Sequence, residues 1–96
     1  MENEPIRVHL FVTGRVQGVG FRAFVAQSAV FIGVTGWVRN VGLDSVEVMV
    51  EGSRHQVDTL VNAVKTGPRA SRVDDTWLEE DPSTGEFPDF EIRSSR

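Results

Sequence analysis

The chain has 96 residues, of which 40% are hydrophobic, a net charge of −4 and no cysteine. This length lies below the usual domain size, so we expect a single domain over residues 1–96. The lack of cysteine excludes disulfides, thiolate metal sites and a cysteine nucleophile, and it fits a reducing compartment. No apolar run approaches the roughly 20 residues that span a bilayer, and the first residues are neither basic nor apolar. We therefore expect a cytoplasmic protein that does not contact a membrane.

Charge is distributed unevenly along the chain. Residues 5–43 contain four arginines and no acid, whereas residues 74–91 contain eight acids and no lysine or arginine. An acid-free segment that carries glycines and arginines indicates a site for a small anion, and the acidic overall balance argues against a nucleic-acid groove. The alternative is an uneven scatter of acids over solvated faces.

The first half of the chain predicts a strand, a loop and a helix. Apolar residues alternate with period two over residues 6–12, which predicts a strand with two different faces. Residues 14–20 contain three glycines and predict a loop. Residues 21–32 repeat apolar side chains at helical spacing, and Gly33 supplies the C-terminal stop.

Two further strands and a second helix follow. Residues 34–40 and 45–51 are short valine-rich alternating runs, which predict a hairpin. Ser53 and Gln56 have the spacing of a capping box and predict the start of a helix that ends at Gly67-Pro68. The chain then alternates weakly over residues 73–80, and residues 87–93 add a short final strand.

The resulting order β-α-β-β-α-β predicts an α+β fold, the split βαβ arrangement of a ferredoxin-like sandwich. We expect an antiparallel sheet of four to five strands, with both helices on one face and the other face partly wet. A right-handed crossover makes the first two strands parallel, with the third between them. Their C-terminal ends then share one edge, which places the glycine loop roughly 10 Å from Asn40.

The glycine loop has the features of an anion site. It joins a strand to a helix N-terminus, where free N–H groups and the positive end of the helix dipole favour anions. Its glycines let several amides point at one centre. No Gly-Lys-Ser/Thr follows, and Gly-x-Gly-x-x-Gly is absent, so it is neither a Walker A loop nor a dinucleotide fingerprint. The alternative is a glycine-rich connection with a purely geometric purpose.

Arg22 and Asn40 are the candidate side chains. Arg22 is a cation in the first helical turn, where the dipole disfavours it by about 0.3–1 kcal/mol, and such a violation is typical of a functional site. Its guanidinium can hold a phosphoryl group through two oxygens, as lysine cannot. The amide of Asn40 can hold a water without protonating it. The alternatives are a surface arginine packed on Phe21 and an asparagine that merely precedes a turn.

Two segments resemble signatures of the acylphosphatase family. The segment Gly14-Arg15-Val16-Gln17-Gly18-Val19-Gly20-Phe21-Arg22 is similar to the family's Gly-x-Val-Gln-Gly-Val-x-Phe-Arg at every fixed position. The segment Gly36-Trp37-Val38-Arg39-Asn40 resembles the second signature, and Phe90-Glu91-Ile92-Arg93 resembles a closing segment. The chain departs from the family in the hairpin, where it carries Leu43-Asp44 and family members often carry Asp-Gly.

The resemblance implies an enzyme that hydrolyses the carboxyl-phosphate bond of acyl phosphates to carboxylate and inorganic phosphate. It implies that Arg22 binds the substrate phosphate and that Asn40 orients the attacking water. It also implies that the phosphate is cradled by the backbone amides of six loop residues, Arg15, Val16, Gln17, Gly18, Val19 and Gly20.

We expect no metal ion and no cofactor, because the only histidines, His9 and His55, belong to no cluster with metal-like spacing. The expected partner is a small acyl phosphate substrate, and we expect a monomer that binds no nucleic acid. Two alternatives remain open. One is a non-catalytic module of the same fold that binds an anion or acyl phosphate, and the other is a nucleic-acid reader, although the strands lack paired aromatic residues.

Overall fold

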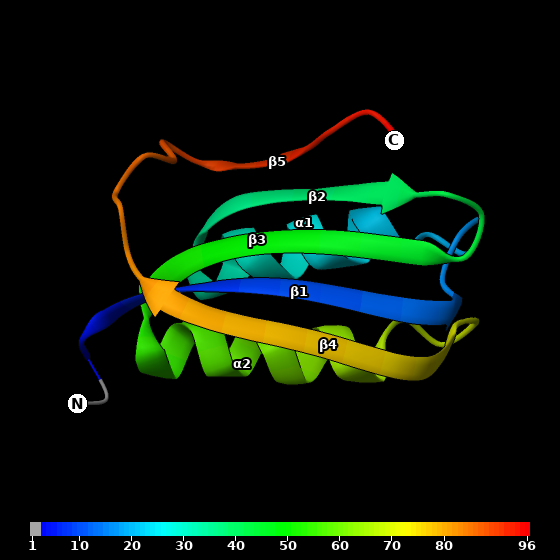
Figure 1. Ribbon diagram of the computed structural model, residues 1–96, viewed down its shortest axis with the longest axis horizontal. Coiled ribbons are helices and arrows are strands. Elements are labelled where there is room, and N and C mark those ends of the chain that lie inside the picture. The colour runs from blue at the N-terminus through cyan, green and yellow to red at the C-terminus, as the bar shows by residue number, and fades with distance from the viewer. Residues whose placement is uncertain (1–2) are drawn as a thin grey trace.

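The computed structural model describes residues 3–96, which form five strands and two helices (Figure 1). In chain order the elements are β1 (Pro5–Arg15), α1 (Phe21–Ile32), β2 (Thr35–Val41), β3 (Ser45–Ser53), α2 (Arg54–Thr66), β4 (Arg72–Pro82) and β5 (Phe90–Ile92). This order and the ferredoxin-like fold confirm the sequence prediction. The boundaries differ mainly in two places. β1 runs to Arg15 because a bulge after Thr13 lets it continue beside β4, and β5 covers only Phe90–Ile92 of the predicted residues 87–93.

The strands form one sheet in the order β4-β1-β3-β2-β5. β1 and β2 are both antiparallel to β3, which lies between them, so they run parallel to each other as predicted. β5 differs from the expected antiparallel pattern, because it pairs parallel with β2 and makes the sheet mixed. The C-terminal ends of β1 and β2 lie at the same end of the sheet (Figure 1).

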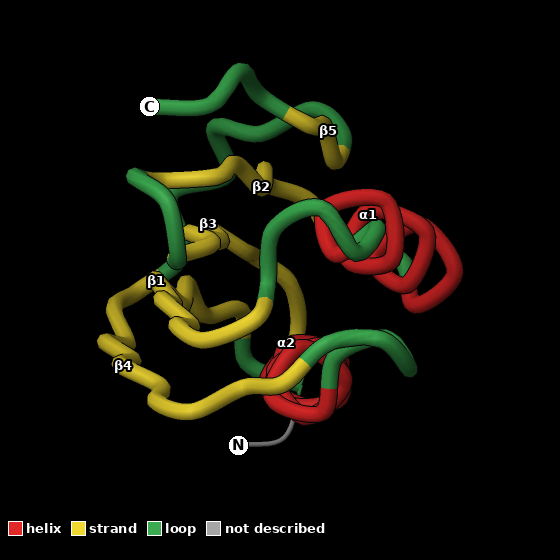
Figure 2. The backbone as a smooth tube through the Cα atoms, turned by 90° about the vertical axis from the view of Figure 1, so that its right-hand side faces the viewer, coloured by secondary structure: helices red, strands yellow, loops and turns green. Residues whose placement is uncertain are grey.

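Both helices cover one face of the sheet (Figures 1 and 2). The core between the helices and the sheet consists of aliphatic side chains and Phe21. α2 begins at the predicted capping box, in which the backbone N–H of Gln56 donates to Ser53 Oγ and the backbone N–H of Ser53 donates to Gln56 Oε1. α1 ends at Gly33, whose N–H donates to the carbonyl of Ala29. No helix within residues 3–96 has the length and apolar character to cross a membrane.

The other face of the sheet carries two buried carboxylates. Glu47 and Glu51 alternate along β3 with valines of the core, so they lie on the face that the helices leave open. Glu47 accepts hydrogen bonds from Arg39 Nε at 2.6 Å and lies 2.6 Å from His9 Nε2. Burial raises the pKa of Glu47, but the bonds from Arg39 and His9 outweigh it and lower the pKa. These pairs hold β1, β2 and β3 together on the open face.

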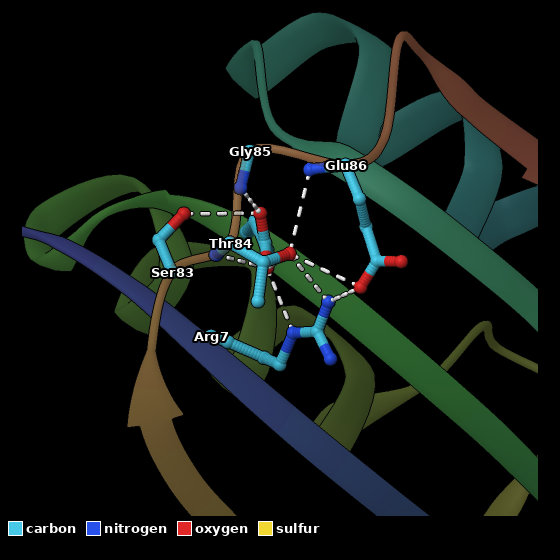
Figure 3. Close-up of polar contacts among 6 residues, drawn as sticks. Arg7, Ser83, Thr84, Gly85 and Glu86 are labelled. Atoms are coloured by element: carbon cyan, nitrogen blue, oxygen red, sulfur yellow. Dashed lines mark hydrogen bonds and ion pairs between the residues drawn. The ribbon is translucent and has the colours of Figure 1, made fainter.

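Glu51 fastens the connection between β4 and β5. Its side chain is 3% exposed and accepts hydrogen bonds from Arg7 Nε, the Ser83 hydroxyl and the backbone N–H groups of Thr84 and Gly85. Figure 3 shows the donor residues Arg7, Ser83, Thr84 and Gly85 gathered at one place. Burial raises the pKa of Glu51, but the bonds from Thr84, Arg7, Gly85 and Ser83 outweigh it and lower the pKa to about 2. The buried charge therefore fixes where the chain leaves β4 on its way to β5.

Candidate anion-binding site

A hollow of about 280 Å³ lies at the end of the sheet where β1 and β2 terminate, beside the N-terminus of α1. It is lined by Val16, Gly18, Gly20, Phe21, Arg22, Ala23, Asn40 and Ile92. The structure therefore brings the glycine loop, Arg22 and Asn40 to one place. Three residues predicted for the cradle, Arg15, Gln17 and Val19, are not among those that line the hollow.

The loop is curled at two glycines. Gly18 has φ 72° and Gly20 has φ 76°, in the left-handed region that residues with side chains rarely adopt. An added Cβ would meet no atom within 4 Å at either position, so the backbone conformation and not space is what requires glycine there. The resulting curl brings the chain directly from the end of β1 into α1 along the wall of the hollow.

The N-terminus of α1 is left without a side-chain cap. Gly20 occupies the N-cap position, no acidic residue stands in the first turn, and the cation Arg22 does. The first N–H groups of a helix have no intrahelical acceptor, and the helix dipole adds partial positive charge there. Because Phe21, Arg22 and Ala23 line the hollow and no carboxylate of residues 3–96 does, this end of the helix presents positive charge to it.

Arg22 is half-buried and has no acidic partner among the described residues. Its Nη1 donates to the carbonyl of Arg93 at 3.4 Å. No carboxylate within residues 3–96 forms an ion pair with it. A guanidinium with five N–H donors and one long bond to a carbonyl keeps most of its donors available to an anion.

Asn40 lies in β2 opposite Val46 of β3 and is half-buried. Its carbonyl accepts a hydrogen bond from the backbone N–H of Arg96 at 2.8 Å. Its side chain lines the hollow and makes no hydrogen bond within the described part of the chain. The amide can therefore both donate to and accept from a molecule in the hollow.

Gln17 has a role that sequence reasoning missed. Its Nε2 lies within hydrogen-bond distance of three carbonyl oxygens, 2.9 Å from Ser45, 3.1 Å from Gly42 and 3.3 Å from Val41. The side chain therefore ties the glycine loop to the turn between β2 and β3, which follows Asn40. No sequence pattern marks this contact, because its acceptors are backbone atoms more than twenty residues away. The turn keeps this contact with Gln17 although it carries Leu43-Asp44, where family members often carry Asp-Gly.

Ile92 of β5, together with Phe21 and Ala23, also lines the hollow without having been predicted as part of the site. The available signal was the closing segment around Phe90 and Ile92. It could not place Ile92 beside the loop, because that position depends on the pairing of β5 with β2.

No group of three or more histidine, cysteine, aspartate or glutamate side chains in residues 3–96 is arranged to hold a metal ion. The hollow combines a curled glycine loop, a helix N-terminus without a side-chain cap, a guanidinium with no acidic partner in residues 3–96 and an amide with no hydrogen bond there. These features are typical of one class, a ferredoxin-like α+β protein, and they make the hollow a candidate site for a small tetrahedral oxyanion.

Comparison with known proteins identifies the family. The acylphosphatase family model matches residues 8–92. An acylphosphatase of Syntrophotalea carbinolica is 46% identical over 90 residues, which are 94% of this chain and 98% of that protein. The crystal structure of acylphosphatase from Bacillus subtilis superposes with a TM-score of 0.87 at 38% identity and covers 92% of this chain and 98% of that chain. A Coxiella burnetii acylphosphatase structure gives a TM-score of 0.87 at 32% identity over 94% of each chain.

The chain belongs to the acylphosphatase family. It is an enzyme that hydrolyses the carboxyl-phosphate bond of acyl phosphates, as the sequence predicted. The relatives match over nearly their whole length and carry the enzyme's name, which favours this activity over a non-catalytic binding module.

Proposed function

We propose that water attacks the phosphoryl group of the acyl phosphate directly, while Arg22 and the glycine loop hold the phosphoryl oxygens. The observation that carries this proposal is the guanidinium of Arg22, which has no acidic partner in the described residues. It lies beside a helix N-terminus without a side-chain cap, in a hollow that no carboxylate of residues 3–96 lines. An acyl phosphate already contains a good leaving group. Hydrolysis therefore needs neutralised charge and a placed water more than a strong base.

In this mechanism Arg22 grips two phosphoryl oxygens and stabilises negative charge as the carboxylate departs. Backbone N–H groups of residues 15–20 complete the cradle. The support for the cradle is the positive φ of Gly18 and Gly20 and the place of both residues in the wall of the hollow. The N–H groups at the start of α1 lie next to it and add to the same attraction.

Asn40 orients the attacking water in line with the bond that breaks. Its free amide lines the same hollow as Arg22, as this role requires. None of the described residues that line the hollow carries a general base, so the proton of the water passes to a phosphoryl oxygen of the substrate. The reaction then forms no phosphoenzyme and requires no metal ion or cofactor.

Hydrolysis of benzoyl phosphate in ¹⁸O-labelled water tests this mechanism. With a chelator present we expect undiminished turnover and the label in inorganic phosphate, because water attacks phosphorus. Label in benzoate would place the attack at the carbonyl carbon. A phosphorylated protein trapped by acid quench, or activity abolished by the chelator, would also contradict the proposal.

We also propose that the enzyme acts as a single-domain monomer in the cytoplasm and binds no nucleic acid. A reducing compartment fits a chain without cysteine, and the net charge of −4 opposes binding to polyanions. Sedimentation equilibrium, cell fractionation and a fluorescence titration with short RNA test these three points in turn. A dimer, a secreted product or saturable RNA binding would overturn the corresponding point.

A further inference from the structure

Ile92 is a large apolar side chain left half exposed in the wall of the hollow, at 50% exposure. It lies on β5 in register with the buried Val38, on the same face of the strand as Phe90. Phe90 packs against the core, whereas Ile92 lies one pair further along the strand, beside the hollow. Packing against the core therefore does not explain why a large apolar side chain stands at this position.

The apolar part of the hollow is concentrated at this residue. Of the other apolar residues in its wall, Val16 is 0% exposed and Phe21 is 2% exposed, so they offer little surface to a ligand. Ala23 is exposed but carries only a methyl group. A ligand that extends beyond Arg22 and the loop therefore meets Ile92 as its main apolar neighbour.

The charged residues beside Ile92 leave this wall apolar. Glu91 and Arg93 alternate with Ile92 along the chain, and Arg93 Nε donates to Glu91 Oε1 at 2.8 Å. The Arg93 guanidinium also lies over the ring of Trp37, with 4.9 Å between its Cζ and the ring centroid. Both neighbouring charges are thus engaged with each other or with Trp37.

We propose that Ile92 is a specificity-determining residue that contacts the acyl group and favours acyl phosphates with an apolar or aromatic acyl part. This inference rests on the proposed position of the phosphoryl group between Arg22 and the loop. With that group in place, the acyl part leaves the cradle along the remaining wall of the hollow. An aromatic or branched acyl group then covers the exposed half of Ile92, and an acetyl group is too short to cover much of it.

The magnitude follows from the area that the ligand covers. Removing part of the exposed half of an isoleucine from water corresponds to about a threefold to tenfold change in kcat/KM. Inorganic phosphate has no acyl part, so its inhibition constant should not depend on Ile92. These two quantities separate contact with the acyl group from a change in the phosphate cradle.

The test compares Ile92→Thr with wild type on benzoyl phosphate and acetyl phosphate, with inorganic phosphate as competitive inhibitor. Threonine keeps the β-branched shape that suits a strand and removes apolar surface. Ile92→Met keeps apolar surface and guards against a simple folding defect. Leu78→Thr is the matched control, because Leu78 is 41% exposed on β4 and does not line the hollow.

We expect Ile92→Thr to lower kcat/KM for benzoyl phosphate about threefold to tenfold and for acetyl phosphate less than twofold. The phosphate inhibition constant should be unchanged, and Ile92→Met and Leu78→Thr should behave as wild type. Equal losses on both substrates, or no loss on either, would overturn the role of Ile92. A failure of the proposed phosphate site would instead appear as an unchanged phosphate inhibition constant in Arg22→Ala.

Discussion

Arginines on the open face of the sheet and at the hollow have opposite surroundings. On the open face, Arg7 Nε donates to Glu51 at 2.7 Å and Arg39 Nε donates to Glu47 at 2.6 Å, and both carboxylates are almost fully buried. At the hollow, Arg22 has the carbonyl of Arg93 at 3.4 Å and no acidic partner within residues 3–96. The comparison separates arginines that hold the fold from one that is free to bind an anion.

The difference has a physical basis in how each charge is compensated. A buried carboxylate without its donors costs several kcal/mol, so the partners of Glu51 and Glu47 are required for folding. Arg22 is only half-buried, so solvent can reach its charge without a carboxylate partner. Substitutions in the two regions should therefore separate catalysis from stability.

The largest expected effect is on catalysis at Arg22. Arg22→Ala should lower kcat/KM by about a thousandfold or more, because it removes the guanidinium to which we assign the stabilisation of the phosphoryl charge. Arg22→Lys should not restore activity, since an ammonium cannot grip two oxygens. Urea denaturation should show a change in unfolding free energy within about 0.5 kcal/mol, because Arg22 is only half-buried and forms no ion pair with a carboxylate of residues 3–96. Full activity in Arg22→Lys would contradict the two-oxygen grip.

Arg7→Ala should show the reverse pattern, a large loss of stability with little change in kcat. The change leaves Glu51 buried without its guanidinium and should lower the free energy of unfolding by about 3 kcal/mol. The fraction that stays folded should keep its kcat, which is checked by assaying at a temperature well below the transition. A stability loss under 1 kcal/mol would show that the neighbouring hydroxyl and backbone donors suffice for Glu51.

Asn40→Ala should lower kcat about a hundredfold, as expected for the loss of a group that positions the attacking water. The inhibition constant of inorganic phosphate should remain that of wild type. If phosphate binding weakened as much as in Arg22→Ala, Asn40 would be a phosphate ligand and not the group that holds the water.

The low pKa of Glu51 predicts how stability depends on pH. The folded pKa of about 2 lies below the ordinary value of 4.5, so the charged form stabilises the fold above pH 4.5. This contribution is lost as pH falls towards 2, with about 2 kcal/mol gone at pH 3. Urea unfolding of wild type and Glu51→Gln between pH 7 and pH 3 measures it. If the unfolding free energies of the two proteins changed equally with pH, the assignment to Glu51 would be contradicted.

The smallest effect is expected at Gln17. Gln17→Ala removes the donor that ties the glycine loop to the β2–β3 turn, and it should cost about 1 kcal/mol of stability. A looser loop should also raise the phosphate inhibition constant a few-fold. Gln27→Ala, at an exposed position of α1, is the matched control and should change neither quantity. An unchanged inhibition constant in Gln17→Ala would remove Gln17 from the site.

Local sequence signals predicted the elements that begin and end with distinctive residues. The capping box at Ser53 and the glycines at 33 and 67 marked the ends of the two helices correctly. The position of β5 was not predictable, because a strand of three residues has too little alternation to select a partner. Its path instead depends on Glu51, whose donors in Ser83, Thr84 and Gly85 lie more than thirty residues away.

In the candidate site, too, local residue types were predictable and tertiary contacts were not. Arg22 and Asn40 stood out because their residue types suited an anion and a water, and the structure places both in one hollow. The contacts of Gln17 depend on backbone carbonyls of a distant turn, and the position of Ile92 depends on the pairing of β5 with β2. A sequence pattern carries no information about such partners until the sheet order is known.

The most direct test of the central claim is a crystal structure of the enzyme with inorganic phosphate bound. We predict phosphate in the hollow, with two oxygens on the Arg22 guanidinium and others within hydrogen-bond distance of N–H groups of the glycine loop. Phosphate bound elsewhere, with the hollow empty and the Arg22 side chain turned to solvent, would contradict the account.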